Sequence, residues 1–199
     1  MILGITGGTG SGKTTLLQTA RDLGFQVLDC DEVYHALLET DRALLEAIEA
    51  RFPGSVRDGQ LQRKKLGAVV FADPKALSDL NAITHGTIRR AVEQRLCSGG
   101  NTAIDAIALF ESGLAELCDV TVAVTAPEEQ RLRRLMLRDG ITEAYARNRI
   151  QAQPTEEYFR SRCGYVLEND ADEAQFRLKC LAFFRQLGIM KENAKEETL

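Results

Sequence analysis

The feature that most constrains the fold of this chain is a glycine-rich stretch close to its start. Residues 7–14 read GGTGSGKT and match the pattern G-x-x-x-x-G-K-[ST] without a gap. Residues 2–6, ILGIT, have the composition of a short buried strand, and residues 14–23 place their leucines on one face of a helix that Gly24 ends. The sequence therefore predicts a glycine-rich turn between a buried strand and a helix start, which is typical of phosphate-binding loops.

Such a turn binds phosphate groups through its backbone. Glycines let the chain wrap closely, and the N–H groups and the positive end of the helix point at phosphate oxygens. Lys13 would reach the β- and γ-phosphates, and the Thr14 hydroxyl would bind Mg²⁺. We therefore expect a nucleoside triphosphate as the ligand. The residues expected to hold it are Gly8, Thr9, Gly10, Ser11, Gly12, Lys13, Thr14 and Thr15.

The composition indicates one globular unit with room for a small inserted subdomain. The chain has 199 residues, of which 44% are hydrophobic and 27% charged. Because 29 acidic residues balance 25 basic ones, we expect no overall positive potential that would attract nucleic acid or an anionic membrane. The first expected strand begins at residue 2, which leaves no room for a leader. No stretch approaches the ~20 apolar residues of a membrane span. The cysteines lack the spacing of a metal site. We expect a cytoplasmic protein.

The hydrophobic pattern alternates between short apolar runs and helical stretches. Strands are expected at 2–6, 26–29, 102–106, 120–124 and 165–167. Residues 32–96 read as almost wholly helical, with breaks at Pro53-Gly54 and Asp58-Gly59, and the charged residues 191–199 are expected to form a mobile tail. A short helical piece is expected over 109–117, and the helix that starts at Pro127 is expected to end at Gly140, with Thr142 capping the next helix. Strands that alternate with helices predict an α/β fold with a five-stranded parallel sheet, helices on both faces, and ligands at the carboxyl ends of the strands.

Acidic residues follow two of the expected strands and are candidates for chemistry. Asp29 and Asp31 alternate along one strand end, so that in extended geometry both carboxylates would face the same side and one could serve as a base for a hydroxyl proton. The alternative is that Asp31 only caps a helix beginning at Glu32. Asp105 ends another strand, where it would either assist Mg²⁺ through water or serve as a turn residue.

Arginines gather on one face of the helix expected after Pro127. Arg131, Arg134 and Arg138 are spaced i, i+3 and i+7, so their side chains lie on the same side of the helix. This face would form either a lid over phosphate groups or a solvated basic surface.

An ordered set of motifs spans nearly the whole chain. The motifs are 5–14 (ITGGTGSGKT), 28–31 (LDCD), 63–71 (RKKLGAVVF), 109–114 (LFESGL) and 134–140 (RLMLRDG). Together they resemble the dephospho-CoA kinase family, which transfers the γ-phosphoryl group of ATP to the ribose 3′-hydroxyl of dephospho-CoA in the last step of coenzyme A synthesis. The resemblance implies ATP and Mg²⁺ as cofactors and dephospho-CoA as the small-molecule partner, with no nucleic acid and no membrane.

The resemblance also implies a division of the chain and roles for its residues. The nucleotide-binding core would comprise 1–31, 97–126 and 156–199, the helical substrate domain 32–96 and the helical lid 127–155. The implied catalytic residues are Asp31 as the base, Lys13, and Arg138 as the lid cation at the transferring phosphate. The implied substrate residues are Asp29, Arg63, His85 and Glu111, and the implied metal residues are Thr14 and, through water, Asp105.

The chain departs from the family pattern at the rim of this implied site. The family usually has proline where this chain has Gly86 and Ile107, and aspartate where it has Gly164. Two other functions stay open: another small-molecule or nucleotide kinase of this fold, and a non-catalytic nucleotide-binding switch. The chain has no Asn-Lys-x-Asp stretch to recognise guanine, which counts against a guanine-nucleotide switch.

Overall fold

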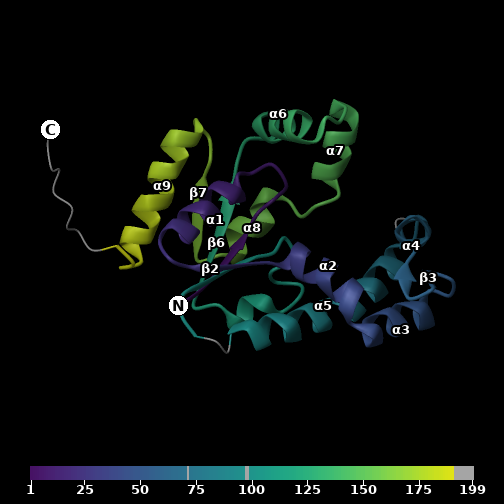
Figure 1. Cartoon of the computed structure of the whole chain (residues 1–199). Coiled ribbons are helices and arrows are strands. Elements are labelled where there is room, and N and C mark those ends of the chain that lie inside the picture. The colour runs from purple at the N-terminus through teal and green to yellow at the C-terminus, as the bar shows by residue number, and fades with distance from the viewer. Residues whose placement is uncertain (71, 97–98, 191–199) are drawn as a thin grey trace, which may run out of the picture. The chain divides into compact units, whose positions relative to one another are not determined.

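The structure is a computed structural model that describes residues 1–70, 72–96 and 99–190 (Figure 1). Its central element is a five-stranded sheet in the order β2-β5-β1-β6-β7. The strands are β1 (Ile2–Thr6), β2 (Gln26–Asp29), β5 (Thr102–Asp105), β6 (Val120–Thr125) and β7 (Tyr165–Glu168). The strands lie where the apolar runs predicted them, so the expected α/β fold with a five-stranded parallel sheet is confirmed.

The composition of β6 shows why an apolar run in the sequence identifies a buried strand. Val122, Ala123 and Val124 are fully buried, as expected for a strand covered on both faces. β6 pairs in parallel with β7, in a register that runs from Val122 opposite Tyr165 to Thr125 opposite Glu168. The carboxyl ends of these two strands therefore lie at the same edge of the sheet.

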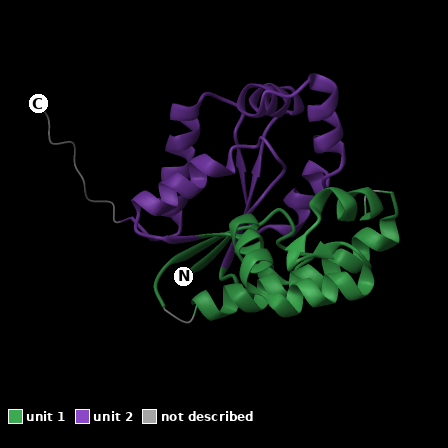
Figure 2. Ribbon diagram, turned by 45° about the vertical axis from the view of Figure 1, so that its right-hand side comes forward, with its two compact units in different colours: residues 1–4, 28–119 green, residues 5–27, 120–199 purple. Residues whose placement is uncertain are grey.

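The chain divides into two compact units (Figure 2). Unit 1 comprises Met1–Gly4 and Leu28–Asp119, and unit 2 comprises Ile5–Val27 and the chain from Val120 onward. The polypeptide passes from one unit to the other after Gly4, after Val27 and after Asp119. Neither unit is therefore a single continuous segment.

Unit 1 is built largely of helices α2 (Cys30–Thr40), α3 (Arg42–Arg51), α4 (Arg63–Val70) and α5 (Pro74–Leu96). An apolar cluster that includes Leu44, Ile48 and Leu66 holds them together. The expectation of an almost wholly helical stretch is wrong at one place, where β3 (Val56–Arg57) and β4 (Gln60–Leu61) pair as an antiparallel hairpin. Asp58 and Gly59 form its turn with φ of 52° and 73°, the left-handed geometry that a two-residue hairpin requires.

Unit 2 contains helices α1 (Lys13–Asp22), α6 (Glu128–Asp139), α7 (Glu143–Gln151), α8 (Glu156–Arg162) and α9 (Glu173–Gln186). α1 packs against α9, and α6 packs against α7 through a cluster that includes Leu135 and Ile150 (Figure 1). Gly140 ends α6 with a φ of 64°, and the Thr142 side chain caps α7, as predicted. The sequence did not predict α8, which is short and is capped by Thr155.

Three smaller features of the chain are the segment after β5, the end of the chain and the composition of its helices. The short helical piece expected over 109–117 is reduced to a 3₁₀ turn at Leu114–Leu117. The tail expected over 191–199, and residues 71, 97 and 98 of other predicted segments, lie outside the described residues. Across the described ranges, no helix has both the length and the apolar composition that crossing a membrane would demand.

Candidate active site

The phosphate-loop residues of unit 2 lie between β1 and α1. Gly7, Gly10 and Gly12 have φ of 135°, 76° and 102°, a backbone region that favours glycine. Gly12 is the N-cap of α1, so the first helical amides begin at Lys13, inside the motif. The predicted order of strand, glycine-rich turn and helix start is therefore present.

The polar side chains of the loop have different surroundings. Lys13 Nζ donates a hydrogen bond to the Gly7 carbonyl oxygen at 2.9 Å. Thr14 is exposed, whereas Ser11 is buried and its hydroxyl oxygen has no hydrogen-bond partner among the described residues. A phosphate chain in the loop would offer the Lys13 ammonium group a charged acceptor in place of a neutral carbonyl, which gives a stronger hydrogen bond.

Two of the arginines predicted to share one face of α6 contact the loop backbone. Arg131 is only 9% exposed, and its Nε donates to the Thr9 carbonyl oxygen at 2.9 Å. Arg134 Nη1 donates to the carbonyl oxygens of Gly10 at 3.2 Å and Ser11 at 3.3 Å. Burial lowers the pKa of both guanidinium groups. The alternative of a solvated basic face is therefore wrong for Arg131 and Arg134.

The third arginine of this face, Arg138, is exposed and pairs with its neighbour. Its Nε and Nη2 donate to the Asp139 carboxylate at 2.7 and 3.0 Å, and Arg149 Nη1 donates to the same carboxylate at 2.6 Å. The bonds from Arg138 and then Arg149 lower the pKa of Asp139 to about 2, and the bond to Asp139 raises the pKa of Arg138. The guanidinium group of Arg138 is thus fixed by the Asp139 carboxylate in the last turn of α6.

Two residues that were not predicted from the sequence also contact the loop. Asn169, directly after β7, is 4% exposed, and its Nδ2 donates to the Ser11 carbonyl oxygen at 2.8 Å. Gln153 Oε1 accepts a hydrogen bond from the Thr9 backbone N–H at 2.7 Å. The position of Asn169 at the carboxyl end of a strand is a signal that could have found it, whereas Gln153 lies in an irregular segment that offers no such signal.

The acids after β2 are arranged differently from the prediction. α2 begins at Cys30, directly after β2, so Asp29 is its N-cap and Asp31 lies in its first turn. Asp29 Oδ1 accepts hydrogen bonds from the N–H groups of Asp31 at 2.8 Å and Glu32 at 3.3 Å. Both the same-side arrangement of a strand and a cap at Asp31 are therefore wrong, because the chain becomes helical earlier than expected. Asp31 itself is exposed.

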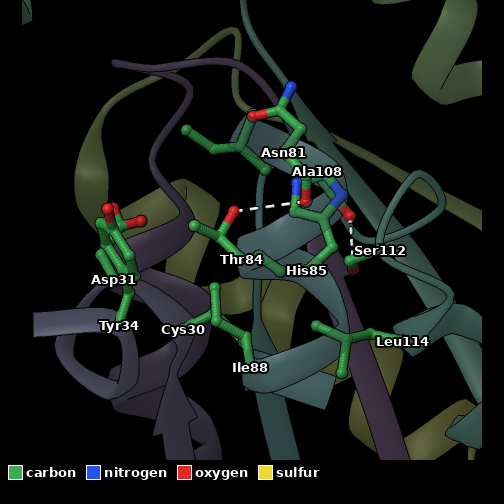
Figure 3. Close-up of a pocket in the computed structure, with 12 residues that line it drawn as sticks. Cys30, Asp31, Tyr34, Asn81, Thr84, His85, Ile88, Ala108, Ser112 and Leu114 are labelled. Carbon is green, nitrogen blue, oxygen red and sulfur yellow. Dashed lines mark hydrogen bonds between the residues drawn. The ribbon is translucent and has the colours of Figure 1, made fainter. Parts of the chain in front are cut away.

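A cavity of about 240 Å³ lies beside Asp31 within unit 1 (Figure 3). Asp31 and Tyr34 line it from α2, Asn81 and His85 line it from α5, and Ile107 lines it from the segment after β5. The structure therefore brings the candidate base and one candidate substrate residue, His85, to the same cavity. Ile107, which stands where the family usually has proline, is part of its wall.

The other predicted residues of unit 1 are not among those that line this cavity. Asp105 ends β5, and its carboxylate adds to the effect of burial in raising the pKa of the Cys30 thiol to about 12. Arg63 starts α4, and its Nη2 lies 3.0 Å from Nδ1 of His35. Glu111 is exposed. Cys30, which does line the cavity, is accordingly held as a neutral thiol.

Metal-binding side chains are not clustered in the described part of the chain, where no group of three or more histidines, cysteines and acids is arranged to hold an ion. A divalent cation that used Thr14 or Asp105 would thus take most of its ligands from phosphate oxygens and water, as Mg²⁺ commonly does.

The fold and the loop define a class of protein, the phosphate-loop nucleotide-binding proteins built on a parallel α/β sheet. The solved structure of TT1252 from Thermus thermophilus matches with a TM-score of 0.80 and 33% identity, over 96% of this chain and 98% of that one. Shikimate kinase from Bacteroides thetaiotaomicron matches with a TM-score of 0.59 and 16% identity, over 94% of this chain and 98% of that one. The second likeness is one of fold alone.

Sequence comparison identifies the family within this class. A family model described as dephospho-CoA kinase matches residues 1–175. The dephospho-CoA kinase of Geobacillus kaustophilus is 37% identical over 200 residues, which cover 96% of this chain and 99% of that protein. The dephospho-CoA kinase of Syntrophotalea carbinolica is 35% identical over 194 residues, covering 94% and 92%. The chain belongs to the dephospho-CoA kinase family, as its motifs predicted.

Proposed function

We propose that this chain transfers the γ-phosphoryl group of ATP to the ribose 3′-hydroxyl of dephospho-CoA. The observation that carries the proposal is the family match over residues 1–175, which includes both the phosphate loop and the Asp31 cavity. The reaction would complete coenzyme A synthesis in the cytoplasm. We assign 1–31, 97–126 and 156–199 to the nucleotide-binding core, 32–96 to the substrate domain and 127–155 to the lid.

The phosphate loop of unit 2 suits the donor. A Cβ atom at Gly8 would lie 2.2 Å from Arg131 Nη2, and one at Gly12 would lie 2.1 Å from Asn169 Nδ2, so a side chain at either position would displace a residue that contacts the loop backbone. Lys13 would exchange the Gly7 carbonyl for the β- and γ-phosphates. Thr14 and, through water, Asp105 would hold Mg²⁺, which neutralises charge on the phosphates when bound.

The cavity of unit 1 suits the acceptor. The Asp31 carboxylate would accept the proton of the 3′-hydroxyl while the hydroxyl oxygen forms its bond to the γ-phosphorus. The bond from that phosphorus to the bridging β–γ oxygen breaks, and ADP leaves. Asp29, Arg63, His85 and Glu111 would bind or orient the substrate around this base. Arg138 would balance charge on the transferring group.

A substitution at Asp31 tests this assignment. Asp31→Asn removes the proton acceptor and nothing that binds ATP, so turnover should fall by about 10²–10⁴-fold while the dissociation constant for Mg-ATP changes less than about twofold. Turnover is measured as 3′-phosphorylated product from Mg-ATP and dephospho-CoA. The matched control is Glu32→Gln, an exposed neighbour on the same helix, which should keep wild-type turnover.

The choice of acceptor is tested by offering other alcohols to the wild-type protein. High turnover with a different acceptor and none with dephospho-CoA would make the chain another small-molecule kinase. Tight ATP binding without consumption by any acceptor would instead indicate a nucleotide-binding switch. Wild-type turnover in Asp31→Asn would remove Asp31 from the mechanism.

A further inference from the structure

Three consecutive carbonyl groups of the phosphate loop accept hydrogen bonds from side chains outside the loop. The Thr9 carbonyl accepts from Arg131 Nε at 2.9 Å, and the Gly10 carbonyl accepts from Arg134 Nη1 at 3.2 Å. The Ser11 carbonyl accepts from Arg134 Nη1 at 3.3 Å and from Asn169 Nδ2 at 2.8 Å. The donors come from α6 and from the residue after β7, so two distant segments of unit 2 hold one short stretch of backbone.

These contacts also set the direction of the loop amides. In a trans peptide unit the C=O and N–H bonds point in opposite directions. A Thr9 carbonyl that accepts from Arg131 turns the Gly10 N–H away from the Arg131 side chain, and a Ser11 carbonyl that accepts from Asn169 turns the Gly12 N–H away from the Asn169 side chain. The N–H between them, that of Ser11, donates within the loop to the Gly8 carbonyl at 3.2 Å. A loop whose amide directions are fixed can present N–H groups to a phosphate anion.

The side chains that hold the carbonyls are themselves tightly enclosed. Arg131 is 9% exposed and Asn169 is 4% exposed. Arg131 Nη2 is buried without a hydrogen-bond partner among the described residues and lies against Gly8, where a Cβ atom would approach it to 2.2 Å. Arg134 is fixed further, since its Nη2 donates to Asn169 Oδ1 at 3.1 Å and to Gln130 Oε1 at 3.2 Å. Burying charged donors is costly, so a packing role alone does not explain them.

We propose that Arg131, Arg134 and Asn169 are positioning residues of the phosphate loop, which orient its amides through its carbonyls and do not touch the phosphates. This inference rests on the proposed use of the loop for ATP. It divides the arginine face of α6 into two parts with different tasks. Arg131 and Arg134 position the backbone of the loop. Arg138 is the remaining arginine of that face, and it is the one that would contact a phosphate.

The experiment compares two arginines that are neighbours in the chain. Arg134→Met removes the donor to two carbonyls, and Arg133→Met is the matched control, because Arg133 is exposed on the same helix. We expect Arg134→Met to raise the dissociation constant and the KM for Mg-ATP about tenfold, with the KM for dephospho-CoA changed less than about twofold. Arg134→Lys, which keeps the charge but has no planar fork, should recover part of the loss. Arg133→Met should match the wild type.

The outcomes separate positioning from other roles. Equal Mg-ATP affinity in Arg134→Met and Arg133→Met would overturn the proposal, and so would equal losses for both substrates, which would indicate a general structural role. If Arg134→Met does not fold, Arg134→Lys carries the same test, and a wild-type affinity for Mg-ATP in that variant would overturn the proposal. If the wild type binds ATP but does not phosphorylate dephospho-CoA, the proposed function fails, whereas a weaker Mg-ATP affinity in Arg134→Met still supports positioning.

Discussion

The N-cap of α2 offers a sharp test of how the fold places the candidate base. Asp29 Oδ1 accepts hydrogen bonds from Asp31 N–H at 2.8 Å and Glu32 N–H at 3.3 Å, so it holds the turn that carries Asp31. Of these two bonds only the shorter lies within the usual range of N–H···O distances, so Asp29→Ala should lower the free energy of unfolding by about 1 kcal/mol, in the middle of the range for N-caps. That loss corresponds to a fall of roughly 2–4 °C in Tm for a chain of this size.

The effect on turnover should be larger than the effect on stability. When the first turn frays, the Asp31 carboxylate leaves its position, and misplacement by about 1 Å can cost up to about a hundredfold in rate. Asp29→Asn keeps a side chain that caps as well as aspartate and loses only the favourable charge at the helix N-terminus, worth about 0.3–1 kcal/mol. It should therefore retain turnover within a few-fold of the wild type. Thermal unfolding and product formation from dephospho-CoA are measured on each variant.

A second cap in unit 1 supplies the control. Asp41 caps α3 by accepting from Leu44 N–H at 2.9 Å, and it is not among the residues that line the Asp31 cavity. Asp41→Ala should lose about 1 kcal/mol of stability at unchanged turnover. If Asp29→Asn lost as much turnover as Asp29→Ala while remaining stable, the charge of Asp29 would matter and its capping would not. A loss of turnover in Asp41→Ala equal to that in Asp29→Ala would also refute the reasoning.

Two further predictions concern glycine and pH. Gly8→Ala should weaken Mg-ATP binding measured by calorimetry, because its Cβ would lie 2.2 Å from Arg131 Nη2. Gly86→Ala has nothing within 4 Å of its Cβ, so it should raise the free energy of unfolding by about 0.5–1 kcal/mol. Asp139→Asn should be less stable than the wild type at neutral pH. Because the pKa of Asp139 is lowered from 3.8 to about 2, its ion pairs stabilise the fold above pH 4 and cease to do so as the pH falls toward 2, so urea unfolding curves of the two proteins should converge there. A gap that stayed constant over this range would contradict the assignment.

Much of the fold follows from local signals. The strands are apolar runs bounded by turn residues, and the phosphate loop is a motif whose glycines are needed for its positive φ angles. The β3–β4 hairpin escaped prediction because strands of two residues are too short to show an alternating pattern, although its Asp58-Gly59 turn was visible as a break. The start of α2 was misplaced because the helix follows β2 without a linker, so that Asp29 serves both elements.

The candidate site was predictable in its residue types and less so in its contacts. Helical spacing places Arg131 and Arg134 on one face, but it cannot say what covers that face, and the carbonyls that cover it belong to residues more than a hundred positions earlier in the chain. The contact of Asn169 is hidden from the sequence for the same reason, since its partner Ser11 is remote in sequence. Contacts of this kind depend on the tertiary fold, which local propensity does not encode.

The way the chain passes between its two units has a consequence for synthesis on the ribosome. All residues of unit 1 have been synthesised once Asp119 has been added, whereas the loop within residues 5–27 still lacks the side chains that donate hydrogen bonds to it. These donors are Arg131, Arg134 and Asn169, which are translated later. Because a chain emerges N-terminus first at about 5–20 residues per second, the nascent phosphate loop spends seconds with its carbonyls bonded to water. The motif that leaves the ribosome first is therefore among the last to reach its native hydrogen bonds.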